Sequence, residues 1–103
     1  MQTHHATRIE IFIELPALKR LSRQLDDSGV TGYSVLPVLA GQGRSGAWTR
    51  EGEVSAAGGM VMVVAVVASE RADSVLESVF EVVSRHIGLV SVSDCRVVRP
   101  ERV

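Results

Sequence analysis

The apolar run from Met60 to Ala68 restricts the possible folds of this chain more than any other feature. All nine of its residues are apolar, and five are valines, which favour an extended conformation. Because successive side chains of a strand point to opposite faces of its sheet, both faces of this strand are apolar and both need to be covered. The run is too short to cross a membrane. It therefore predicts a strand in a sheet that is packed on both sides.

The residues before this run predict two strands and a helix. Residues 8–14 alternate between two faces, with Ile9, Ile11 and Ile13 on one of them, which is typical of a half-buried strand. A helix follows it, with Pro16 in its first turn and Gly29 as its stop signal. A second strand starts at about Gly32, and Pro37 within it favours an edge of the sheet, because proline lacks the N–H that a ladder uses.

A second helix and a last strand follow the run. Ser69 is expected to cap this helix, Gly88 to end it, and the strand to cover roughly 89–98. His86, near the helix end, is expected to contact the helix dipole. The apolar stripe of the helix consists of Val75, Leu76, Val79, Phe80 and Val83.

The order strand, helix, strand, strand, helix, strand predicts an α+β, ferredoxin-like βαββαβ fold with a four-stranded antiparallel sheet. Both helices would cover one face of the sheet. The other face would carry Phe12 and the second apolar side of the 60–68 strand, which a monomer would leave exposed. This favours a closed homo-oligomer.

A long glycine-rich segment separates the second and third strands. Six of the nine glycines lie between Gly41 and Gly59, where the sequence also becomes polar and basic. Long connections without regular structure are uncommon in small domains unless they bind something or move, so we expect a mobile functional loop over about 41–59. Trp48 and Arg50 are predicted to contact a partner there, with packing of Trp48 on its own protein as the alternative.

Composition limits the class of protein. At 103 residues, the chain is expected to form a single domain, 1–103. Its formal charge of -1 gives no indication of nucleic-acid binding. The single cysteine, Cys95, excludes an internal disulfide, and residues 1–7 lack the apolar core of a secretory signal. We therefore expect a soluble, cytoplasmic protein.

Catalytic and metal sites are not expected. No nucleophile with a base, and no evident pair of carboxylates, accompanies the glycine-rich turn, so the sequence does not predict an enzyme. His4 and His5 are the metal candidates, but adjacent terminal histidines are usually disordered. No metal site is therefore predicted.

The segment 29–35, the turn Gly41-Gln42-Gly43-Arg44 and the end of the 60–68 strand together resemble the PII signal-transduction proteins. The resemblance is closest to the PII-like branch associated with carboxysomes, carbon fixation and bicarbonate transport, and it covers about residues 8–99. It implies a homotrimer with its sheets packed around a central axis. It also implies an adenine nucleotide in each cleft between subunits.

The resemblance further implies roles for individual residues. Gly41, Gly43 and Arg44 match the family's phosphate-contacting turn, and backbone N–H groups with a guanidinium do bind anions. The other nucleotide-binding candidates match the pocket lining, the connection after the second helix and the C-terminal arginines: Gly32, Ser34, Gly88, Arg96 and Arg99. The bicarbonate candidates are Gly41, Gln42, Gly43 and Arg44.

Departures from the family pattern refine the hypothesis. No lysine follows the second helix, so ADP or AMP is favoured over ATP. Ser45 replaces a glutamine of the nitrogen-sensing branch, which argues against 2-oxoglutarate as a ligand.

The predicted function is a regulatory sensor of adenine nucleotide and bicarbonate whose loop controls a partner such as an inorganic-carbon transporter. The alternative is a ferredoxin-like trimer that binds a metal or serves as a structural interaction module, without nucleotide.

Overall fold

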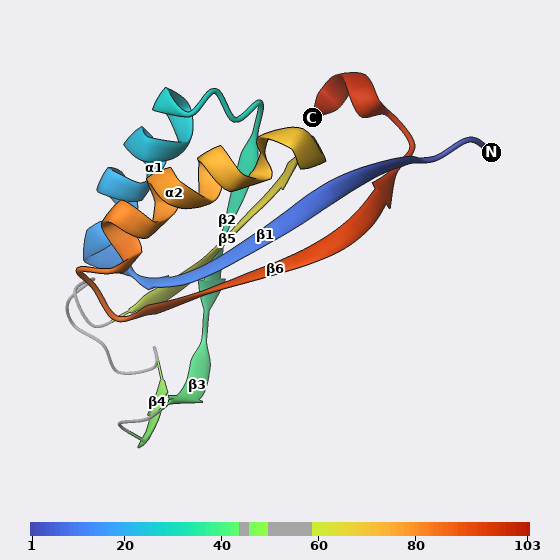
Figure 1. Cartoon of the computed structure of the whole chain (residues 1–103). Coiled ribbons are helices and arrows are strands. Elements are labelled where there is room, and N and C mark those ends of the chain that lie inside the picture. Colours follow the sequence, from blue (N-terminus) through green and yellow to red (C-terminus); the bar gives the residue numbers. More distant parts are fainter. Residues whose placement is uncertain (44–45, 50–58) are drawn as a thin grey trace.

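Figure 1 presents the computed structural model of the chain, which describes residues 1–43, 46–49 and 59–103. A four-stranded antiparallel sheet of order β2-β5-β1-β6 carries two helices on one face, which confirms the predicted ferredoxin-like fold. The elements are β1 His4–Glu14, η1 Leu15–Ala17, α1 Leu18–Asp27, β2 Tyr33–Val38, β3 Ala40–Gly43, β4 Gly46–Thr49, β5 Met60–Val67, η3 Ser69–Arg71, α2 Ala72–Val83, β6 Gly88–Val97 and η4 Pro100–Arg102.

The central strand β1 is longer than the sequence predicts. It starts at His4 rather than near Arg8, because β6 continues beside it as far as the pair His4 and Val97. The expectation that His4 and His5 lie in a disordered terminus is therefore wrong. On its other side β1 pairs with β5, from Thr7 opposite Val67 to Glu14 opposite Met60.

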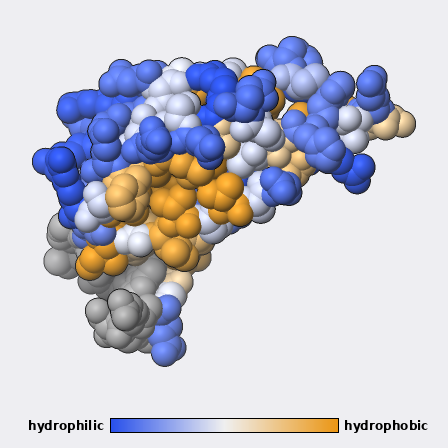
Figure 2. All heavy atoms as spheres, in the orientation of Figure 1, coloured by the Kyte–Doolittle hydropathy of each residue, from blue (hydrophilic) through white to orange (hydrophobic). Residues whose placement is uncertain are grey.

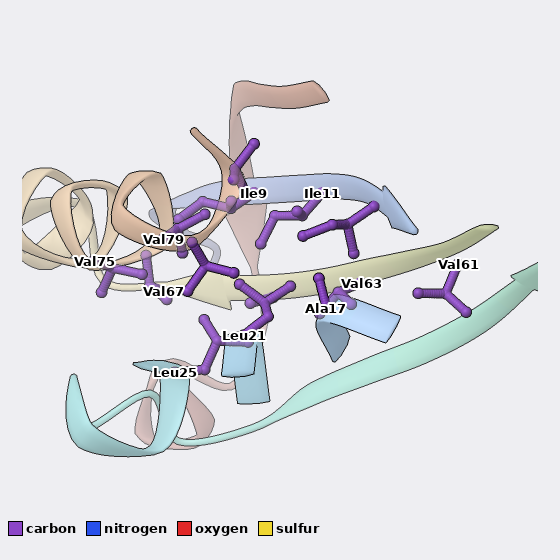
Figure 3. Close-up of a cluster of buried hydrophobic side chains, with 14 of the residues drawn as sticks. Ile9, Ile11, Ala17, Leu21, Leu25, Val61, Val63, Val67, Val75 and Val79 are labelled. Atoms are coloured by element: carbon purple, nitrogen blue, oxygen red, sulfur yellow. The ribbon is translucent and has the colours of Figure 1, made fainter. Parts of the chain in front are cut away.

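The core lies between the sheet and the two helices. Figure 3 shows aliphatic side chains from both layers meeting there. The alternation predicted for β1 is observed from Thr7 to Glu14, where one residue in two is buried, and β5 has one buried face although its residues are apolar on both. The fully enclosed large side chains are Ile9, Ile11, Ile13, Leu21, Leu25, Val63, Val75 and Val79.

The opposite face of the sheet is apolar and only partly buried. Phe12 on β1 lies opposite Met62 on β5, which in turn lies opposite Leu36 on β2. Leu36 is 41% exposed. Pro37 lies on β2, which pairs only with β5 in the described sheet, so the predicted edge position of this proline is confirmed.

The helix α1 ends at Asp27, two residues before Gly29, the stop signal that the sequence predicts. Gly29 has a φ of 75°, a left-handed conformation that costs other residues free energy. The Nη2 group of Arg71 donates a hydrogen bond to the carbonyl of Ser28, at 2.6 Å. This contact satisfies a carbonyl group at the helix end and joins α1 to the start of α2.

The limits of α2 differ from the prediction. Ser69 does not cap this helix; it lies in the preceding turn η3, and its Oγ accepts a hydrogen bond from Thr7 Oγ1 at 3.1 Å. The helix ends at Val83, and Gly88 instead begins β6. A Cβ on Gly88 would lie 2.6 Å from the carbonyl oxygen of Phe12, so this position needs glycine because β1 passes too closely for a side chain.

The apolar stripe of α2 also differs from the prediction. Val75, Val79 and Val83 are buried as expected, and Val82 joins them, but Phe80 is 65% exposed. Neighbouring helix positions are separated by about 100° around the axis, so a helix that turns Val79 to the sheet turns Phe80 away from it. Within the described residues, no helix combines the length and the apolar character needed to cross a membrane.

Candidate functional site

The glycine-rich segment leaves and re-enters the sheet at one end. Val38 closes β2 opposite Met60, which opens β5 and lies opposite Glu14 at the end of β1. The carbonyl of Gly59 accepts a hydrogen bond from the N–H of Leu15, at 2.9 Å. We call this end of the sheet, formed by residues 13–15, 38 and 59–60, the loop root.

The segment begins as a hairpin rather than as an irregular loop. β3 pairs with β4 as a separate two-stranded ribbon, with Gly41 opposite Trp48 and Gln42 opposite Ala47. The prediction of a turn at 41–43 is therefore wrong, since these residues form a strand. In such a ribbon only every second residue directs its N–H to the paired strand, so part of the β3 backbone faces outward and can bind an anion.

The remaining loop candidates are only partly described. Gly43 lies opposite Gly46 in the ribbon. Arg44 and Arg50, predicted to contact phosphate and a partner, lie outside the described residues, as does most of the expected mobile loop.

A contact between His86 and Glu14 joins the loop root to the connection between α2 and β6. The His86 Nδ1 atom lies 2.9 Å from Glu14 Oε1, and the same oxygen accepts a hydrogen bond from the N–H of Ile87 at 3.4 Å. His86 lies just beyond the last residue of α2, Val83, and its expected contact with the helix dipole stays a prediction. Nothing in the sequence couples His86 and Glu14, which are 72 positions apart.

The other ring nitrogen of His86 has unused hydrogen-bonding capacity. Its Nε2 atom is buried and has no partner among the residues that the structure describes. A buried polar atom without a partner costs folding free energy, on the order of 1–3 kcal/mol. The sequence analysis singled out His86 but missed that it contacts Glu14 of the loop root.

Gly88 lies at the loop-root end of the sheet. It pairs with Ile13, one position before Glu14. The structure thus places Gly88 at the same end of the sheet as the exit toward Gly41 and Gly43. Its requirement for glycine is, however, already explained by the close approach to Phe12.

The predicted C-terminal arginines lie at the opposite end. Arg96 pairs with His5 and is eight residues from Gly88 along β6, a separation of about 27 Å at the usual rise of a strand. Arg99 is exposed, and its Nε donates a hydrogen bond to Glu101 Oε1 at 3.1 Å. Neither arginine is brought near Gly88 within the chain.

Gly32 and Ser34 lie on the other edge of the sheet. Ser34, on β2, pairs with Val64 and is exposed. Gly32 precedes this strand, and a Cβ built on it would meet nothing within 4 Å. Within one chain the predicted nucleotide-binding residues therefore lie in three places: at the loop root, at the opposite end of β6 and on the β2 edge of the sheet. They do not form one pocket.

A groove lies between α2 and β6, with a volume of about 530 Å³. It is lined by Asp73, Leu76, Glu77, Phe80 and Val90, none of them predicted to bind nucleotide. In the part of the chain that the structure describes, no three His, Cys, Asp or Glu residues are placed to hold a metal ion.

The strand order and the two helices on one face define a ferredoxin-like protein, here with a hairpin that follows β2 in the sequence and projects from the end of the sheet. Residues 6–102 match the family model for Nitrogen regulatory protein P-II. The chain therefore belongs to the P-II family, and its structural neighbours place it in the PII-like branch.

Solved structures of PII-like proteins superpose on nearly the whole chain. CPII from Thiomonas intermedia K12, bound to ADP, AMP and bicarbonate, has a TM-score of 0.87 and 27% identity over 98% of this chain and 95% of that one. CPII bound to ADP and bicarbonate has a TM-score of 0.82 and 29% identity over 98% and 96% of the two chains. No curated protein sequence matches the chain.

A more distant relative has the same fold. A PII-like signaling protein from Thermus thermophilus has a TM-score of 0.81 and 24% identity, over 98% of this chain and 97% of that one.

Proposed function

We propose that the protein is a PII-like regulatory sensor that binds an adenine nucleotide, ADP or AMP rather than ATP, together with bicarbonate in clefts between the subunits of a homotrimer. The observation that carries this proposal is the similarity to CPII, which extends over 98% of the chain and whose structures hold ADP and bicarbonate. P-II proteins are regulatory, so the proposed role is signalling and not catalysis.

The spacing of the candidate residues supports a site between subunits. Gly88 and Arg96 are separated by about 27 Å along one strand, farther than one nucleotide reaches. If both contact the same nucleotide, they belong to different copies of the chain. Gly32 and Ser34, on the other edge of the sheet, fit the same arrangement.

The apolar sheet face supports an oligomer. Phe12, Met62 and Leu36 form a continuous row across three strands, on the face that the helices leave uncovered. Apolar surfaces of this kind are usually buried by association. Three sheets packed around an axis would cover this face in every copy.

The β3 backbone is the proposed bicarbonate site. Its two glycines, Gly41 and Gly43, permit a close approach to the outward N–H groups, and Gln42 between them is exposed. Arg44, which follows in the sequence, would add a charge-assisted hydrogen bond to bicarbonate or phosphate.

Regulation requires that ligands change the loop. We propose that nucleotide and bicarbonate favour one arrangement of residues 41–59, and that Trp48 and Arg50 then contact a target such as an inorganic-carbon transporter. The ligands must bind the two loop arrangements with different affinities, since otherwise no shift occurs.

Calorimetric titration of the purified full chain tests the proposal. ADP and AMP should bind more tightly than ATP, and bicarbonate should raise ADP affinity. Arg44→Ala should weaken ADP binding by about tenfold or more, because hydrogen bonds to charged groups contribute roughly 1.5–3 kcal/mol. Arg23→Ala is the control, since Arg23 is exposed on α1.

Two results would contradict the proposal. Absence of binding by any adenine nucleotide would remove the sensor function and favour the metal-binding or interaction-module alternative. Unchanged ADP affinity in both Arg44→Ala and Gly43→Val would show that the hairpin is not the phosphate site.

A further inference from the structure

Glu14 lies where two parts of the proposed site meet. It is the last residue of β1 and lies opposite Met60 at the start of β5, while its neighbour Ile13 pairs with Gly88 at the start of β6. Figure 1 shows the connection from α2 arriving at this same end of the sheet. Glu14 is therefore adjacent both to the returning end of the glycine-rich segment and to the residues before Gly88.

The carboxylate of Glu14 holds the connection where α2 no longer does. The N–H groups of residues 84–86 still donate hydrogen bonds to carbonyl groups in the last turn of α2. The N–H of Ile87 donates instead to Glu14 Oε1, at 3.4 Å, and His86 Nδ1 lies 2.9 Å from the same oxygen. Glu14 therefore fixes the chain at the residue before Gly88.

The contact of Glu14 with His86 is partly sheltered from water. The two side chains are 29% and 19% exposed, and Nε2 of His86 is buried without a partner among the described residues. Figure 2 shows hydrophobic residues gathered in one area of the surface, over α2 and β6, the two elements that the connection joins. Because water competes less for partly buried hydrogen bonds than for exposed ones, Glu14 holds the imidazole in place.

The backbone at the same end of β1 holds the returning glycine-rich segment. The N–H of Leu15 donates to the carbonyl of Gly59, at 2.9 Å. Met60, opposite Glu14, also lies opposite Val38, the last residue of β2, and β3 starts two residues after it. Paired backbone therefore links the start of the hairpin to Glu14, the kind of contiguous contact through which two sites can be coupled.

We propose that Glu14 is a positioning residue that couples bicarbonate bound at β3 to adenine nucleotide bound at Gly88. This step rests on the proposed function, which assigns the two ligands to these places. Bicarbonate at β3 fixes the strand ends at Val38 and Met60, and these hold the backbone of Glu14. Its carboxylate then holds Ile87 and, through it, the backbone of Gly88. Glu14 itself contacts neither ligand.

Calorimetric titration of the purified full chain with ADP, with and without bicarbonate, tests the proposal. The quantity of interest is the ratio of the two dissociation constants. In the wild type, bicarbonate should tighten ADP binding by about fivefold or more, and in Glu14→Ala by less than about twofold. A residue with a purely structural role would weaken ADP binding equally in both titrations and leave the ratio unchanged.

Two further variants serve as controls. Glu14→Gln should keep most of the coupling, because its amide oxygen can still accept both hydrogen bonds. Glu10→Ala is the matched control: Glu10 also lies on β1 and is 28% exposed, but it pairs with Arg8, at 3.0 Å. Its ratio should equal that of the wild type. Sedimentation of each variant verifies that the state of assembly is the same.

His86→Ala provides the test if Glu14→Ala does not fold. It removes one of the two donors to Glu14 and should lower the ratio by at least about twofold, as expected for neighbouring residues in one network. An unchanged ratio in Glu14→Ala, or in His86→Ala where that variant replaces it, would overturn the proposal and leave the proposed function intact. Absence of ADP binding to the wild type, or of any bicarbonate effect on it, would overturn both.

Discussion

The imidazole of His86 and the carboxylate of Glu14 lie 2.9 Å apart and connect the end of the central strand to the connection between α2 and β6. Glu14 also lies opposite Met60, and the next residue, Leu15, donates its N–H to Gly59. The connection before Gly88 is thus held by Glu14, and the returning end of the glycine-rich segment by Glu14 and its neighbour Leu15.

Removing this contact should loosen the loop root. His86→Ala is expected to lower the free energy of unfolding by about 1 kcal/mol, because the pair is partly buried and hydrogen bonded. Hydrogen exchange should also quicken at the amide of Ile87. His86→Asn is the control, since its side-chain amide can still donate near the position of Nδ1. Unchanged exchange in His86→Ala would mean that the contact does not hold the connection.

Gly88→Ala should destabilise the fold because of the close carbonyl of Phe12. A Cβ only 2.6 Å from this oxygen forces β1 and β6 apart, at a cost of about 1–3 kcal/mol and several degrees in Tm. Gly32→Ala is the matched control, because its Cβ would meet nothing within 4 Å. Equal melting temperatures for the two variants would contradict this account of Gly88.

Gly29→Ala should destabilise the end of α1. The φ of 75° costs an alanine about 1–2 kcal/mol, and its Cβ would also lie 2.7 Å from Nη2 of Arg71. Gly29→Asn should lose less, because asparagine tolerates the left-handed conformation better. Urea denaturation measures both variants, and a reversed order of stability would show that the backbone conformation does not govern this position.

Phe12→Ser should weaken self-association, because Phe12 lies in the middle of the uncovered sheet face, opposite Met62. We expect the dissociation constant of the oligomer to rise by at least about tenfold, as for a central apolar residue of an interface. Ser91→Ala, at an exposed position of the same face, should leave it unchanged. Analytical ultracentrifugation distinguishes the outcomes, and an unaltered mass for Phe12→Ser at low concentration would argue against this face as the interface.

The sequence predicts the sheet better than the ends of its helices. Burial of one face leaves a direct trace in the spacing of Ile9, Ile11 and Ile13, and the uninterrupted apolar run from Met60 to Val67 marks a strand that is apolar on both faces. The prediction for Phe80 is wrong because apolar residues flank the buried row Val75, Val79 and Val83 on both sides, and only the packed orientation of the helix buries Val82 and leaves Phe80 exposed. The prediction that Gly88 ends the helix is wrong because a stop signal and a close strand contact both require glycine.

The candidate site is less predictable than the fold. The β3–β4 ribbon escapes detection because its glycines give it no apolar alternation. The contact of His86 with Glu14 and the separation of Gly88 from Arg96 depend on which strands pair and in what register. These are properties of the whole sheet, and short motifs do not carry them.

Under the proposed function, the long span of β6 between Gly88 and Arg96 would make ligand response depend on protein abundance. If one nucleotide needs both ends of this strand, a lone subunit presents two incomplete halves and the complete site arises only on assembly. Mass action then makes apparent ligand affinity rise with subunit concentration until the ring is saturated, and bound ligand in turn holds the ring together. In a cell that makes few copies, the protein would therefore bind its ligand weakly. The amount of protein would then set how strongly it responds to a given ligand concentration.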